Sequence, residues 1–130
     1  MHSSHPMSDH LDYRNLDVWK RAHSAVLAIY RATQTFPSEE RFGLCSQIRR
    51  AAVSVPANIA EGRSRLTPRA FSAFLDNAGG SAAEVSYLLL LSHDLGFLDA
   101  SKYSPLASEI EEIRRMVAGL RRYVVSRTPR

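Results

Sequence analysis

Apolar residues recur in alternating steps of three and four along four stretches of the chain. That spacing places them on one face of an α-helix. It predicts helices at about residues 17–35, 39–62, 67–95 and 100–126. Their inner faces are expected to carry Trp19, Ala22, Val26, Ile29 and Thr33; Cys45, Ile48, Ala52, Val55 and Ile59; Phe71, Leu75, Ala78, Ala82, Val85 and Leu89; and Leu106, Ile110, Ile113, Val117, Leu120 and Val124.

Residues with strong terminal preferences mark the ends of these helices. Ser38 is a candidate N-cap for the second helix, and Thr67, which precedes a proline, is one for the third. Gly96 is a typical C-terminal stop, because glycine readily adopts positive φ. Either Asp99 or Ser104 is expected to cap the fourth helix.

The connections between the predicted helices are only a few residues long. Short connections make consecutive helices antiparallel, so the expected fold is all-α, an up-down-up-down antiparallel four-helix bundle. The bundle should span residues 15–126 as one domain. Residues 1–14 are polar and unpatterned and predict a disordered tail, and residues 127–130 predict a short C-terminal tail.

Two helices carry more apolar residues than one inner face needs. A helix that is apolar on several sides must be covered on several sides, which predicts contacts between subunits. A monomer with an enlarged core is the alternative. The candidate subunit contacts are Val53 and Ala60 on the second helix and Tyr87, Leu88, Leu90 and Leu91 on the third.

The charge balance is mildly basic. Seventeen Lys and Arg residues face thirteen Asp and Glu residues, for a net charge of +4, and only Lys20 and Lys102 are lysines. Arginine binds phosphate and carboxylate in a planar fork, so an anionic partner is favoured. The single cysteine, Cys45, suits a reducing compartment. The chain also has no apolar run of about 20 residues and no secretory signal. We therefore expect a cytoplasmic protein with no membrane partner.

The arginines gather on the second and fourth helices, where acids are scarce. Such a surface attracts phosphate polymers without reading their sequence. The alternative is that these arginines are solvated or pair with Glu109, Glu112 or Asp76; Arg115 has Glu111 four residues earlier. We expect Tyr123 to face the core, so the aromatic residues typical of single-strand binders are missing. The candidate nucleic-acid contacts are Arg49, Arg50, Arg63, Arg65, Arg114, Arg115, Arg121 and Arg122.

No catalytic triad, metal cage or nucleotide fingerprint is visible, so we expect neither an enzyme nor a cofactor. Glu61 and Glu84 could form a carboxylate pair, but neither has the histidine three residues later that bundle di-iron sites use. We therefore assign them, with Asn58, a structural role in which Arg49 or Arg50 pairs with a glutamate. The small residues at 78–83 follow no strand and predict close helix approach rather than a phosphate loop.

Four segments together identify a family resemblance: QIRRAAVSVPANIAEG at 47–62, LDVWKRAH at 16–23, FP at 36–37 and GSAAEVSYLLLLSHDLGFL at 80–98. Pro56 in the first segment should bend its helix, because proline cannot donate to the carbonyl of Ala52. From Leu16 to Val125 the chain closely resembles the bacterial four-helix-bundle proteins encoded in intervening sequences of 23S rRNA genes.

The resemblance implies a ring, typically a homopentamer. A related group, the accessory variability proteins of diversity-generating retroelements, is similar in fold and works with a reverse transcriptase and its RNA. Two hypotheses follow: an oligomer that binds RNA or DNA through its arginines, with RNA favoured, and a structural adaptor that docks a protein such as a reverse transcriptase.

Overall fold

The computed structural model describes residues 12–127, and these form helices with no strand among them. The four long helices are α2 (Asp17–Ala32), α3 (Leu44–Arg63), α4 (Pro68–Asp94) and α5 (Ala100–Ser126). Three short 3-10 helices accompany them: η1 (Tyr13–Asn15), η2 (Thr33–Thr35) and η3 (Ser38–Glu40). The all-α class expected from the apolar pattern is confirmed for the described residues.

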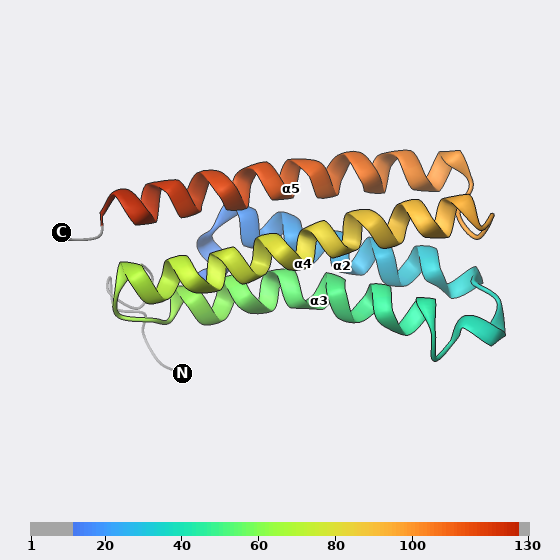
Figure 1. The fold of residues 1–130 in the computed structure, drawn as a ribbon, viewed down its shortest axis with the longest axis horizontal. Helices are drawn as coiled ribbons and strands as arrows, with labels where there is room; N and C mark the ends of the chain where they lie inside the picture. The colour runs from blue at the N-terminus through green and yellow to red at the C-terminus, as the bar shows by residue number, and fades with distance from the viewer. Residues whose placement is uncertain (1–11, 128–130) are drawn as a thin grey trace, which may run out of the picture.

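The helices lie side by side along one long axis (Figure 1). In this view α2 and α4 run from left to right, and α3 and α5 run back. Helix α3 packs against α2 and α4, while α5 packs against α4 and α2. Helices α2 and α4 therefore sit at opposite corners of the arrangement, so their outward faces point in different directions.

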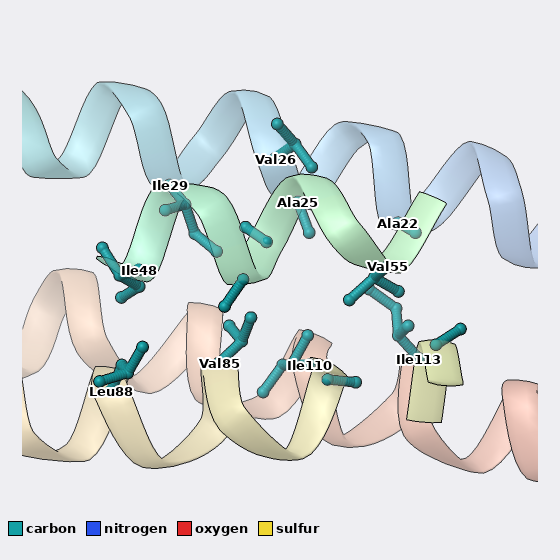
Figure 2. Packing of buried hydrophobic residues seen from close by; sticks show 14 of the residues in the cluster. Ala22, Ala25, Val26, Ile29, Ile48, Val55, Val85, Leu88, Ile110 and Ile113 are labelled. Carbon is teal, nitrogen blue, oxygen red and sulfur yellow. The ribbon is translucent and has the colours of Figure 1, made fainter. Parts of the chain in front are cut away.

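The core lies between the four inner faces. Figure 2 shows side chains from all four helices meeting there, among them Ala22, Ile29, Val55, Val85 and Ile113. The predicted inner faces of α3 and α4 are buried throughout, whereas Trp19, Leu106 and Leu120 are half-buried at the edge of the core. Burying this much apolar surface is the main force that holds a bundle of this size together.

The boundary before α3 differs from the prediction. Instead of a helix from residue 39, Ser38–Glu40 form the 3-10 helix η3, and α3 starts only at Leu44. The backbone of Gly43 adopts a non-helical conformation, with φ −108° and ψ −111°. The carboxylate of Glu40 accepts from the amide of Leu44 at 3.1 Å. Glu40 thus satisfies one of the free amides of α3, a role that Ser38 was expected to fill.

The other helix ends follow the sequence more closely. The Thr67 hydroxyl accepts from the amide of Ala70, and Asp99, not Ser104, caps α5 through the amide of Lys102. Gly96 has φ +83° and lies directly after the last turn of α4, as expected for a glycine stop. Helix α2 ends at Ala32 and continues as η2.

The prediction of a disordered tail over residues 1–14 is wrong for the last of these residues. Tyr13–Asn15 form η1, and the Tyr13 ring packs edge-on against Trp19 with centroids 5.0 Å apart. Asp12 caps this turn and binds Arg14 through both carboxylate oxygens. Residues 1–11 and 128–130 lie outside the described residues.

Helix α3 continues without interruption through Pro56, which is buried. Near its end, Gly62 is buried against the start of α4. A Cβ atom on Gly62 would lie 2.7 Å from Phe74 Cβ and 2.9 Å from Phe71 Cδ1. A glycine is therefore needed for α3 and α4 to approach this closely. No helix among residues 12–127 is long and apolar enough to cross a membrane.

Candidate nucleic-acid interface

A groove between α4 and α5 brings together three of the predicted arginines. It has a volume of about 470 Å³. Arg114, Arg121 and Arg122 line one wall, and on α5 Arg114 lies about two turns before the adjacent pair Arg121 and Arg122. The α4 wall is formed by Leu75, Asp76, Gly79 and Gly80, so there are no long side chains opposite the arginines. We name this feature the α4–α5 groove.

The arginines of the α4–α5 groove are only loosely held. Arg114 donates to the carboxylate of Glu111 at 3.1 Å, and Arg121 lies 3.8 Å from Asp76. Both pairs are solvent-exposed, and such pairs contribute only about 0–1 kcal/mol. Arg122 has no ion-pair partner within residues 12–127. A phosphate could therefore replace these protein partners at little cost.

Glu111 is also held from the neighbouring helix. The hydroxyl of Ser86 on α4 donates at 3.0 Å to Oε2 of Glu111, the same oxygen that Arg114 contacts at 3.1 Å. This hydrogen bond, and after it the Arg114 guanidinium, lowers the pKa of Glu111 below its ordinary value of 4.5. The carboxylate thus links α4 to α5 beside the groove.

Arg115 does not join the groove. It pairs with Glu112 at 2.7 Å and lies on the exposed side of α5. The prediction that Arg115 pairs with Glu111 is wrong, because the Glu111 carboxylate binds Ser86 and Arg114 instead. The Arg115 hydrogen bond lowers the pKa of Glu112 as well.

Arg49 is a structural residue rather than a free phosphate ligand. Its Nε donates to the hydroxyl of Thr33 at 2.8 Å, and an Nη donates to the carbonyl of Tyr30 at 3.1 Å. Its guanidinium also stacks over the Tyr30 ring, 4.5 Å from the centroid. These contacts connect α3 to the end of α2, so the expected pairing of Arg49 with a glutamate is wrong.

Arg50 points to a different region. It lines a cleft of about 490 Å³ between α3 and α4 together with Glu84 and Phe42. Arg50 is exposed and has no ion-pair partner among the described residues. Ser54 and Ser81 share a 2.7 Å hydrogen bond at the same cleft, and it joins the two helices.

The remaining two predicted arginines lie at the end of the bundle. Arg63 and Arg65 line a pocket of about 370 Å³ with Arg127, which is not among the candidate nucleic-acid contacts. Arg65 pairs with Glu61 at 2.7 Å and stacks on Phe74. We name this feature the end pocket. The eight predicted arginines therefore do not form one continuous surface.

The side chain of Tyr123 does not have the predicted orientation. It was expected to face the core, but it is 56% exposed and lines the end pocket. The guanidinium of Arg127 covers one face of its ring, 4.7 Å from the centroid. The heptad pattern missed this residue because Val124, its neighbour, takes the core position at the end of α5.

The candidate subunit contacts divide into buried and exposed residues. Leu88 is 2% exposed and belongs to the core shown in Figure 2, so its assignment to a subunit contact is wrong. Ala60 and Leu91 are half-buried. Val53, Tyr87 and Leu90 are 41%, 58% and 43% exposed, which leaves them free to contact another molecule.

The three structural polar residues have different surroundings. Asn58 donates to the carbonyl and the hydroxyl of Ser54 and so extends the link between α3 and α4. Glu61 pairs with Arg65, whereas Glu84 lines the α3–α4 cleft, and the structure does not join the two carboxylates. No group of three potential metal ligands occurs within residues 12–127.

One bidentate ion pair was not predicted from the sequence. Arg21 on α2 binds both carboxylate oxygens of Glu109 on α5, at 2.9 and 2.6 Å. Glu109 was considered a partner for the basic surface of α5, but its partner comes from the other end of the sequence. Spacing within one helix cannot reveal a pair that is separated by 88 residues.

These features define a small all-α protein of four long helices with arginine-lined surface depressions. The chain belongs to the family of 23S rRNA-intervening sequence proteins, whose model matches residues 14–119. This agrees with the resemblance seen in the sequence motifs.

A solved structure has the same fold. It is the crystal structure of a protein with unknown function from the S23 ribosomal protein family of Bacteroides thetaiotaomicron VPI-5482. The two chains are 22% identical, with a TM-score of 0.72 over 79% of this chain and 96% of the other. No curated protein matches the chain.

Proposed function

We propose that this chain is a non-enzymatic, cytoplasmic oligomer that binds RNA, and that the α4–α5 groove is its main phosphate contact. The single observation behind this proposal is that Arg114, Arg121 and Arg122 line one groove opposite Gly79 and Gly80, with Asp76 as the one acid among the residues that line it. Their guanidiniums can hold phosphate oxygens, and their existing partners are exposed and weak. The membership in a family named for 23S rRNA supports RNA over DNA.

The missing side chains at Gly79 and Gly80 give the groove its shape. The nearest atom to a Cβ on Gly79 would be Val117 Cγ1, at 3.8 Å, and a Cβ on Gly80 would meet nothing within 4 Å. A phosphate backbone could therefore approach α4 without a steric barrier. The contacts would be to phosphate alone, so binding should depend on salt and little on sequence.

We further propose an antiparallel up-down-up-down bundle that assembles into a ring, typically a pentamer in this family. Two of the places with exposed apolar side chains lie along the sides of the helices. Leu27, Tyr30 and Val53 follow the junction of α2 and α3, and Tyr87 and Leu90 lie on the outer face of α4. Because α2 and α4 are at opposite corners, a contact between these two surfaces would be heterologous, and heterologous contacts that close form rings.

The alternative is an adaptor that docks a protein, for example a reverse transcriptase, without binding nucleic acid. It is favoured by the number of arginines that already have protein partners. Arg49, Arg65, Arg114 and Arg115 each hydrogen bond within the subunit. The two proposals differ in whether the groove arginines contribute to RNA affinity.

A salt titration of RNA binding tests the main proposal. The variant replaces Arg114, Arg121 and Arg122 with alanine, and fluorescence anisotropy measures its affinity for a short duplex RNA. Each lost phosphate contact lowers the slope of log K against log salt by about 0.7–0.9, so we expect the slope to fall by about two to three.

The matched control removes the same charge elsewhere. Arg31, Arg69 and Lys102 are exposed and have no ion-pair partner among residues 12–127. Alanine at these three positions should leave most of the slope intact. Equal losses in both triple variants would mean that only net charge matters, and absence of RNA binding at low salt would leave the adaptor as the better explanation.

Light scattering tests the assembly. A ring of five subunits should have about five times the chain mass of 14.5 kDa. A single species of 14.5 kDa at micromolar concentration would eliminate the ring and leave the exposed apolar residues on α4 for another partner.

A further inference from the structure

The end pocket is distinct from the α4–α5 groove. It lies where the turn between α3 and α4 meets the last two turns of α5 and the residue before α2. Leu16, Phe71, Leu120 and Val124 give it an apolar lining. Its volume of about 370 Å³ is at the lower end of the range of about 300–1,000 Å³ that is usual for ligand sites. It could hold a group the size of one nucleotide.

Positive charge surrounds this apolar lining. Arg63, Arg65 and Arg127 line the pocket, and within residues 12–127 the one acid bonded to any of them is Glu61, which pairs with Arg65. That pair is about half exposed, so an added anion could compete for Arg65. Helix α4 also begins here and has no acid in its first turn, so its positive dipole end adds to the same field.

Arg63 has an unsatisfied donor. Its Nε is buried and has no hydrogen-bond partner within residues 12–127. A buried donor without a partner destabilises the folded state, and an anion at a charged donor forms one of the stronger hydrogen bonds in proteins. A phosphate oxygen that accepts a hydrogen bond from this nitrogen would remove the penalty.

The pocket also has an exposed aromatic residue of the kind that single-strand binders use, which the sequence did not predict. The exposed ring of Tyr123 lies beside the three arginines, and Arg127 rests on one of its faces. Leu66, in the turn between α3 and α4, is 93% exposed at the same pocket. An aromatic ring next to guanidiniums is the arrangement with which proteins bind single-stranded nucleic acid.

We propose that the end pocket binds one unpaired nucleotide, with its base against Tyr123 and Leu66 and its phosphate at Arg63 and Arg65. This inference rests on the proposed RNA binding and adds that single-stranded RNA is preferred. A base within a duplex is already stacked on both faces, so it cannot enter the pocket. An acidic peptide could use the guanidiniums, but it would have no need of the tyrosine ring.

Paired substitutions at Tyr123 test the proposal. The full chain is titrated with a fluorescent single-stranded oligouridylate and with a duplex RNA of the same length, at the same salt. Tyr123→Leu keeps an apolar side chain but removes the ring, and Tyr123→Phe keeps the ring. From the usual contribution of base stacking, we expect Tyr123→Leu to weaken single-strand binding about five-fold or more. Tyr123→Phe should bind as the unchanged protein does.

Binding of duplex RNA distinguishes the end-pocket proposal from the proposal that the α4–α5 groove binds RNA. If Tyr123→Leu reduces single-strand affinity and leaves duplex affinity unchanged, the end pocket is the nucleotide site. If both variants bind single strands as the unchanged protein does, the pocket proposal is overturned while groove binding stands. If no RNA binds at low salt, both proposals fail.

A second measurement does not depend on a substitution. The Arg63 Nε–H resonance, followed by NMR, should shift on addition of the single-stranded oligouridylate and not on addition of the duplex. An unchanged resonance at saturating oligouridylate, or a shift caused by an acidic peptide but not by oligouridylate, would contradict the assignment of a nucleotide to this pocket.

Discussion

Gly62, on α3 where it packs against α4, and Gly80, within α4, have opposite structural roles. At Gly62 the start of α4 is so close that an added Cβ would lie under 3.0 Å from two phenylalanine side chains. At Gly80, in the middle of α4, an added Cβ would meet nothing within 4 Å. The first glycine permits close packing of two helices, and the second leaves a groove beside three arginines.

The comparison shows that a glycine in a helix does not by itself indicate close packing. The small residues at 78–83 predicted close helix approach, and Ala78 and Ala82 are indeed fully buried. Gly79 and Gly80 are not: Gly79 would make only an ordinary contact, at 3.8 Å. The prediction is therefore wrong for these two glycines, because they lie on the side of α4 that faces the α4–α5 groove.

The largest change in folding stability is expected from a substitution at Gly62. Gly62→Ala places a methyl group against Phe71 and Phe74, neither of which is a flexible chain end. Overpacking of this kind typically costs about 1–3 kcal/mol. We expect a lower denaturation midpoint with an unchanged slope in urea at fixed protein concentration. A variant as stable as the unchanged chain would mean that the α3–α4 turn relaxes easily.

The same substitution at Gly80 should stabilise the protein rather than destabilise it. Alanine is favoured over glycine inside a helix by about 0.5–1 kcal/mol, and nothing near Gly80 opposes the added methyl group. Gly80→Ala should therefore raise the denaturation midpoint in the same urea assay. Destabilisation would show that another subunit or part of the chain packs against this groove.

The smallest expected effect concerns the hydrogen bond from Ser86 on α4 to Glu111 on α5, which also binds the groove residue Arg114. Because the folded-state pKa of Glu111 lies below 4.5, the bond adds stability above that pH, and the stability is lost as the pH falls through the folded pKa. Ser86→Ala should raise the pKa of Glu111 toward 4.5, as measured by NMR titration of its side-chain carboxyl group.

Glu112 is the internal control for this titration. Its pKa is lowered mainly by Arg115, on the same helix, so Ser86→Ala should leave it unchanged. If the Glu111 titration does not move, Arg114 rather than Ser86 determines its ionisation, and α4 is not electrostatically linked to α5 here.

The arginines illustrate which parts of the candidate site were predictable. Their concentration on α3 and α5 is visible in the sequence, and so is the shortage of acids after Glu112. Their sorting into the groove, the cleft, the end pocket and the Arg49 link depends on which helix lies opposite each one. Arg49 and Arg114 are on similarly basic stretches, yet one is bonded across to Tyr30 and Thr33 and the other lines a groove.

Local patterning determined the helices of this protein. The three-and-four spacing of apolar residues identifies the buried faces, and Thr67, Gly96 and Asp99 act at helix ends through groups a few residues away. These interactions are short in sequence, so the sequence offers the residues as candidates, although it left Asp99 and Ser104 both open and did not predict the contact between Glu40 and Leu44.

Contacts between distant segments were decided only by the tertiary structure. The exposure of Tyr123, the burial of Leu88, the Arg21–Glu109 pair and the open space at Gly80 all depend on the neighbour that packing brings to each side chain. Helical periodicity tells which residues share a face, but the distance and the identity of the opposite helix determine whether that face is core, groove or pocket.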